Sequence, residues 1–213
     1  MIVYSHRRSG THLLMEYLKM CFGKNFVKKH VLEDADHNSK FYPIIYVYRD
    51  GRDTLTSCYH WWKTSGESRV CGIQPYFKDL SFSDYLKGIE VPGFREHISP
   101  NGNRNIMQLE VNRGLFRTPV SFWCRHIESC DTHANTSVKF ESLINCPERV
   151  MERFSDIFEW KMKRKAKKLN RLVGYHPRKG KVGDHWNMFS AEDYVFFDNI
   201  AGALMKGLGY YEE

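Results

Sequence analysis

The amino-acid sequence predicts one α/β domain, built on a central, mainly parallel β-sheet flanked by helices. Its 213 residues suit a single domain, and two strand–turn–helix units follow one another before residue 65. Residues 43–48 form a continuous apolar run, which is typical of a strand buried on both faces of a parallel sheet. A hydrophobic content of 42% and an aromatic content of 15% can supply a full core and exclude a disordered chain.

The expected elements follow in order along the chain. A short β-type run at 2–4 leads into a turn at 5–11, after which apolar residues repeat at helical spacing. A second short strand is expected at 25–27, and the strand at 43–48 leads into a helix that continues through Trp62. Beyond it the sequence predicts helices at 81–87, 118–130, 147–160, 161–173 and 191–205, a strand at 136–140, and an irregular insertion at about 90–117.

Positive charge is concentrated in one segment. The formal net charge is +7, and residues 161–181 contain ten Lys or Arg and no Asp or Glu, which leaves 22 basic and 25 acidic residues elsewhere. A basic block within a mildly acidic body indicates that an anion is handled near this segment. Its first part, 161–168, is expected to be a solvated helix face; steering of an anionic acceptor or a nucleotide is the functional alternative.

Other features predict a cytoplasmic protein without a membrane span. No segment approaches the roughly 18 uninterrupted apolar residues of a membrane helix. The apolar start is also too short before its arginines for a signal peptide. The six cysteines contain no C-x-x-C pair, as expected for free thiols in a reducing compartment. Neither the cysteines nor the ten histidines show paired metal-ligand spacing, so no metal site is predicted.

Residues 7–12, Arg-Arg-Ser-Gly-Thr-His, lie between the first strand and the first helix. Backbone N–H groups at a helix N-terminus attract an anion, and Gly10 lets the chain approach it closely. Ser9 and Thr11 add hydroxyl donors, and an arginine neutralises charge. The segment is a candidate phosphate cradle, with an ordinary tight turn as the alternative. The G-x-x-x-x-G-K-[ST] loop of nucleotide triphosphatases is absent.

Two further segments contain the residue types of an anion site. Arg49 is expected at the carboxyl end of the third strand, and Ser57, about two helical turns later, can face the same crevice. A guanidinium and a hydroxyl suit a phosphate, whereas a surface ion pair of Arg49 with a nearby aspartate is the alternative. Arg178, Lys179 and Gly180 belong to a short basic, glycine-containing loop, which indicates either an anion lid or a solvated turn.

Taken in this order, the three segments resemble the sulfotransferases that use 3′-phosphoadenosine 5′-phosphosulfate (PAPS). In that family a P-K-S-G-T-T-W loop holds the 5′-phosphosulfate. An R-x-x-x-D-x-x-x-S segment followed by Y-H, together with R-K-G-x-x-G-D, holds the 3′-phosphate. The matching segments here are 7–13, 49–60 and 178–184, and the resemblance covers almost the whole chain. It implies a single sulfotransferase domain over residues 1–213 with a P-loop-like fold.

The resemblance also implies roles for individual residues. Arg8 takes the position of the family's lysine against the leaving phosphate, Lys28 holds the sulfuryl oxygens, and His30 is the base that takes the proton of an acceptor hydroxyl or amine. The product is 3′-phosphoadenosine 5′-phosphate (PAP), and no metal is needed. The acceptor would be a small molecule or a glycan, and the protein a monomer or weak homodimer without a nucleic-acid partner. The implied nucleotide-binding residues are Arg7, Arg8, Ser9, Gly10, Thr11, His12, Arg49, Ser57, Arg178, Lys179 and Gly180.

The chain departs from the family pattern at three positions and leaves two other functions open. Arg8 replaces a lysine, Leu13 stands where cytosolic members have a tryptophan against adenine, and Phe140 replaces a common tyrosine. Adenine packing must therefore differ. A P-loop-type nucleotide kinase is the alternative enzyme, disfavoured by the missing Walker lysine. A non-enzymatic polyanion-binding protein is the other alternative, and it rests on residues 161–181 alone.

Overall fold

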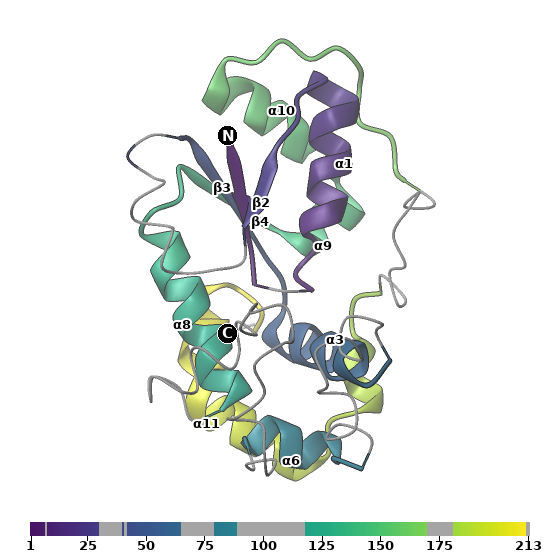
Figure 1. Ribbon diagram of the computed structural model, residues 1–213, viewed down its shortest axis with the longest axis vertical. Helices are drawn as coiled ribbons and strands as arrows, with labels where there is room; N and C mark the ends of the chain where they lie inside the picture. The colour runs from purple at the N-terminus through teal and green to yellow at the C-terminus, as the bar shows by residue number, and fades with distance from the viewer. Residues whose placement is uncertain are drawn as a thin grey trace, which may run out of the picture. The chain divides into compact units, whose positions relative to one another are not determined.

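The computed structural model describes residues 1–6, 8–29, 40, 42–64, 79–88, 118–169 and 181–211. The chain divides into two compact units, each with its own core (Figure 1). Unit 1 comprises residues 1–49 and 126–180, and unit 2 comprises residues 50–125 and 181–213. This division does not decide whether residues 1–213 act as one domain, so that prediction stays a prediction.

Unit 1 is built on a fully parallel, four-stranded sheet, as the sequence predicts. The strands are β1 (Ile2–Tyr4), β2 (Val27–Lys29), β3 (Ile44–Tyr48) and β4 (Thr136–Lys139). Their order is β2-β1-β3-β4, so the chain goes from β1 to one side for β2 and returns to the other side for β3. In open parallel sheets, ligands bind at the carboxyl ends of the strands where the order reverses in this way. The fold therefore directs attention to the ends of β1 and β3.

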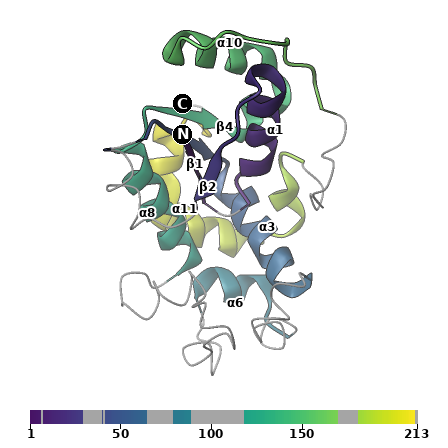
Figure 2. The same cartoon turned by 45° about the horizontal axis from the view of Figure 1, so that its top comes forward.

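Three helices cover one face of this sheet (Figures 1 and 2): α1 (Thr11–Phe22), α9 (Phe140–Asn145) and α10 (Pro147–Phe158). Alternate strand residues such as Val3, Val47 and Val138 join the apolar side chains of the helices in one buried cluster. The opposite face carries Tyr46, whose hydroxyl oxygen lies 3.0 Å from Nδ1 of His126 in the last turns of α8 (Pro119–Asp131). Both faces of β3 are thus covered, which explains its continuous apolar sequence.

Unit 2 is helical in its described residues, with α3 (Gly51–Thr64), α6 (Phe82–Lys87), the first turns of α8, the short 3-10 helix η1 (Asp184–Asn187) and α11 (Ala191–Gly207). The buried carboxylate of Asp53 ties η1 to α3. It accepts hydrogen bonds from the backbone N–H groups of Gly183 and His185, at 2.8 and 3.0 Å, and contacts Nδ1 of His185 at 2.9 Å. Ser190 and Asp193 form a capping box at the start of α11.

Most predicted elements are confirmed, with end points that differ by one or two residues. The strand predicted at 25–27 is wrong by two positions, because β2 pairs with β1 over Val27–Lys29. Phe140, predicted as the end of a strand, instead begins α9. The insertion at 90–117 lies outside the described residues. No helix among the described residues is long and apolar enough to cross a membrane.

The helix predicted at 161–173 is wrong over its described part, residues 161–169, which we call the basic strap. The chain leaves α10 at Glu159, which has a left-handed φ of 52°. The backbone N–H groups of Lys163 and Arg164 donate to the carbonyl of Cys21 in α1, at 2.7 and 3.4 Å, and not within the segment. Met162, Ala166 and Leu169 pack on the core of unit 1 at i, i+4 and i+7, a spacing that a helix would also show.

Candidate functional site

The described residues of the turn between β1 and α1, 5, 6 and 8–10, form a cradle with the first turn of α1 at the carboxyl edge of the sheet. Its first residue is joined to β2, since the N–H of Ser5 donates to the carbonyl of Lys29 at 3.3 Å. The Ser5 and Thr11 hydroxyls share a short hydrogen bond across the turn. Arg8 and Gly10 both have left-handed backbones, with φ of 69° and 100°. Turns with such alternating conformations form concave arrays of N–H groups that bind anions.

The helix that follows the cradle begins without a capping side chain. Gly10 is the N-cap of α1, no side chain accepts from the first-turn N–H groups there, and the first turn contains no acidic residue. An anion at this place would accept from those N–H groups and interact favourably with the helix dipole. The hydroxyl of Ser9 is fully buried and has no hydrogen-bond partner among the residues that the structure describes. A ligand oxygen would satisfy this buried donor as well.

Phe140 and Arg49 support the cradle from positions directly after the neighbouring strands β4 and β3. A Cβ atom added to Gly10 would lie 2.3 Å from Cδ2 of Phe140, so only glycine fits this contact. The Arg49 guanidinium carbon lies 4.8 Å from the centre of the Phe140 ring, and its NH1 group donates to the carbonyl of Arg8 at 3.4 Å. Arg49 is 6% exposed, which contradicts the alternative of a surface ion pair. Stacking and the hydrogen bond fix this guanidinium beside the cradle.

Two further basic residues gather at His12, in the first turn of α1. The ammonium nitrogen of Lys28, the middle residue of β2, lies 3.5 Å from Nε2 of His12. Burial lowers the pKa of His12 from 6.5 to about 4, with smaller contributions from the positive charges of Lys28 and Arg8. At neutral pH the imidazole is therefore uncharged, and Arg8 and Lys28 remain as cations next to an uncapped helix N-terminus. This arrangement favours an anion.

The structure brings together seven of the residues predicted for the site. They are Arg8, Ser9, Gly10, Thr11, His12, Lys28 and Arg49. Ser57 is buried in α3 of unit 2, so its contact with the same phosphate as Arg49 stays a prediction. Arg7, His30, Arg178, Lys179 and Gly180 lie outside the described residues.

The supporting role of Phe140 was not predicted from the sequence, where this residue stood out as a substitution that affects adenine packing. The available signal was its place directly after the predicted strand at 136–140, because the carboxyl ends of parallel strands meet at one edge of a sheet. Which residue it would contact depends on the strand order, and the sequence does not state that order. The described residues contain no group of three or more His, Cys, Asp or Glu side chains that could hold a metal ion.

Comparisons with known proteins give a match only at the level of structure. No protein-family model matches the chain, and no curated protein matches it in sequence. The crystal structure of mouse sulfotransferase SULT7A1 complexed with PAP superposes with a TM-score of 0.59 at 16% identity, covering 96% of this chain and 84% of that one. The crystal structure of retinol dehydratase in complex with androsterone and inactive cofactor PAP superposes with a TM-score of 0.52 at 15% identity. The match covers 96% of this chain and 80% of that one. The chain therefore has the α/β fold of these proteins.

Proposed function

We propose that the chain is a sulfotransferase that moves a sulfuryl group from PAPS to the hydroxyl or amine of an acceptor and releases PAP. The observation that carries this proposal is the cradle. Among the described residues it combines an uncapped helix start, a buried Ser9 hydroxyl without a partner and two cations whose charges act on His12. The fold supports the proposal, because two proteins with this fold were solved with PAP.

The residues present fit the phosphosulfate end of such a donor. Ser9, Thr11 and the first N–H groups of α1 would bind its oxygens, and Gly10 would let the backbone approach them. Arg49 would reach a second phosphate from the end of β3. By the sequence match, the partners of Arg49 at the 3′-phosphate would be Ser57, Arg178, Lys179 and Gly180.

Sulfuryl transfer would require from this chain mainly the positioning of the reactants and the stabilisation of charge. Sulfuryl transfer, like phosphoryl transfer, places the attacking and leaving oxygens roughly in line. Arg8 would stabilise negative charge on the leaving side, but a guanidinium stays protonated and does not donate its proton. Lys28 would stabilise the transferred group's oxygens. His30 follows two residues later in the sequence and would take the acceptor's proton.

His12 would orient Lys28 in this arrangement. With its pKa near 4, the neutral ring can accept a hydrogen bond from the Lys28 ammonium through Nε2, at 3.5 Å. A cationic histidine at this place would instead repel Lys28. We therefore infer that His12 is a positioning residue for Lys28 and not the base.

The test is a transfer assay with labelled PAPS and a panel of hydroxyl and amine acceptors. We expect transfer by the wild-type chain, no transfer by His30→Ala with PAP affinity kept, and a strongly reduced rate for Lys28→Ala. Lys29→Ala is the matched control, because neighbouring strand residues point to opposite faces, and it should transfer at close to the wild-type rate. A wild-type chain that neither binds PAP nor transfers label would overturn the proposal.

A further inference from the structure

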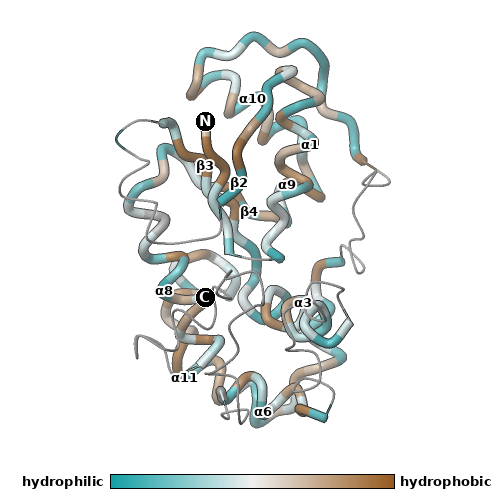
Figure 3. The backbone as a smooth tube through the Cα atoms, viewed as in Figure 1, coloured by the Kyte–Doolittle hydropathy of each residue, from teal (hydrophilic) through white to brown (hydrophobic). Residues whose placement is uncertain are grey.

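The basic strap has one side fixed to the core and one side exposed. Met162, Ala166 and Leu169 are buried or half-buried against the apolar cluster of unit 1. Figure 3 shows most of the strap as hydrophilic. Its remaining residues are all basic and all exposed: Lys161, Lys163, Arg164, Lys165, Lys167 and Lys168. Because the inner side is packed, the fold holds these charges in one row on the surface.

This row runs beside α1 toward the cradle. Near its start the N–H of Lys163 donates to the carbonyl of Cys21 at 2.7 Å, and at its end the N–H of Leu169 donates to the Tyr17 hydroxyl at 3.3 Å. With a rise of about 1.5 Å per residue, these anchor points lie roughly 15 and 9 Å along α1 from Thr11, where the cradle meets the helix. The charges therefore form a strip that approaches the cradle and does not belong to it.

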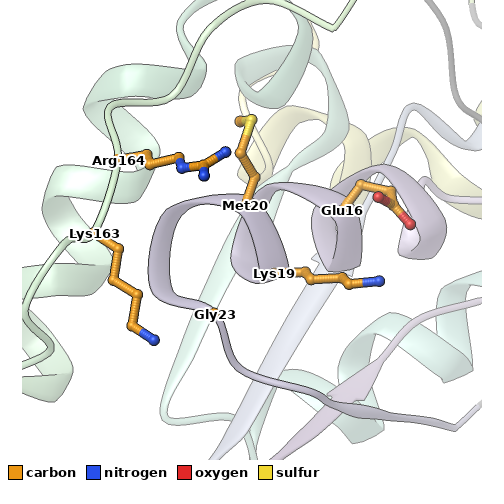
Figure 4. A pocket seen from close by; sticks show the side chains of 6 residues that line it. All are labelled: Glu16, Lys19, Met20, Gly23, Lys163 and Arg164. Atoms are coloured by element: carbon orange, nitrogen blue, oxygen red, sulfur yellow. The ribbon is translucent and has the colours of Figure 1, made fainter.

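A groove of about 390 Å³ lies between the strap and the C-terminal half of α1 (Figure 4). Lys163 and Arg164 of the strap extend toward Met20 of α1 and toward Gly23, the residue that follows this helix, and Lys19 lines the same groove. Glu16 is its one acidic lining residue. Three cations around one concave surface favour the binding of a carboxylate, sulfate or phosphate group.

We propose that the strap and this groove dock an acidic glycan, whose anionic groups pair with the strap while one of its hydroxyl groups reaches the cradle. The proposal rests on the proposed function and names its acceptor class. A ligand that contacts both places must carry negative charges over at least roughly 9–15 Å as well as hydroxyl groups, and an acidic glycan has both on a repeating chain.

The outward side chains favour a glycan over other anionic partners. They include no aromatic residue on which nucleic-acid bases could stack. They include no large apolar residue that could insert into an anionic lipid surface. Five of the six are lysines, which recognise point charges and do not form the planar fork that arginine offers to a phosphate.

The experiment measures binding of a fluorescent heparin octasaccharide to the full chain. The strap variant Lys163→Gln/Arg164→Gln/Lys167→Gln should bind it roughly tenfold more weakly, as expected for three partly screened ion pairs. Arg125→Gln/Arg149→Gln removes two exposed charges that do not belong to the strap and should change the affinity less than twofold. A heparin disaccharide should bind weakly to all of the proteins, because it is too short to reach the cradle from the groove.

Equal octasaccharide binding by the strap variant and the wild-type chain would overturn the proposal. So would tighter binding of a single-stranded oligonucleotide of equal charge, or of vesicles rich in anionic lipid. PAP titrations of the same proteins separate this proposal from the proposed function. Normal PAP binding with no glycan binding would remove only the acceptor assignment, whereas glycan binding without PAP binding would contradict the sulfotransferase.

Discussion

Replacing Gly10 with alanine should destabilise the fold at the cradle for two physical reasons, which two different variants can separate. The backbone at this position has φ of 100°, and an L-residue held in such a left-handed conformation loses roughly 1–2 kcal/mol. The new Cβ would also lie 2.3 Å from Cδ2 of Phe140, so the ring must move, and overpacking of this kind adds about 1–3 kcal/mol. Gly10→Ala should therefore lower the free energy of unfolding by roughly 2–5 kcal/mol.

Chemical denaturation followed by circular dichroism measures this effect, and Gly202→Ala is the matched control. A Cβ on Gly202, inside α11, would have Asp198 Cβ at 3.7 Å as its nearest neighbour, so alanine should stabilise the chain by up to about 1 kcal/mol. In a Phe140→Ala background the steric part should vanish, leaving a loss of about 1–2 kcal/mol for Gly10→Ala. A loss in the wild-type background no larger than the loss in the Phe140→Ala background would refute the contact between Gly10 and Phe140.

Three further predictions concern single residues. Ser9→Ala removes a buried hydroxyl that has no partner among the described residues, so the free energy of unfolding should stay the same or rise by up to about 1 kcal/mol. The affinity for PAP, measured by calorimetry, should fall about tenfold. A loss of stability alongside the loss of affinity would contradict this prediction. Asp53→Ala leaves the N–H groups of Gly183 and His185 without their acceptor, so urea denaturation should show a free energy of unfolding lower by roughly 2–4 kcal/mol. An unchanged urea midpoint would argue against the hydrogen bonds that join η1 to α3. The pKa of His12 in the folded protein, about 4, lies below its unfolded value of 6.5, so the free energy of unfolding should fall as the pH drops from 6.5 to 4. In His12→Gln this fall should be smaller by about 1 kcal/mol, a figure that allows for solvent screening of the half-buried ring. Denaturation at a series of pH values measures the difference.

The sheet could be predicted because its signals are local. The apolar run at 43–48 identifies β3, since both faces of that strand are covered and no polar alternation is needed. β2 was harder to place, because Val27 is 56% exposed and an edge strand needs little apolar sequence. The strap was wrongly predicted as a helix. Its buried residues Met162, Ala166 and Leu169 have the spacing that a helix would also show. The N–H groups of Lys163 and Arg164 donate to the carbonyl of Cys21 in α1. A hydrogen-bond partner so distant in sequence cannot be predicted from the residues of the strap itself.

The sequence predicts the presence of the cradle but not the contacts that shape it. The residue types at 7–12 and their place between a strand and a helix predict an anion site. The left-handed conformation of Arg8, the stacking of Arg49 on Phe140 and the low pKa of His12 all depend on strand order and on packing between distant segments. Those features required the structure.

Calorimetric titration of the full chain with PAP, with adenosine 5′-phosphate and with ATP plus magnesium decides whether the cradle binds the proposed donor. We expect PAP to bind tightly and magnesium to have no effect. Loss of the 3′-phosphate should weaken binding at least tenfold, because Arg49 loses a charge-assisted partner. A preference for ATP with magnesium would contradict the sulfotransferase and favour a kinase. An absence of binding to all three nucleotides would show that the cradle does not hold this class of ligand.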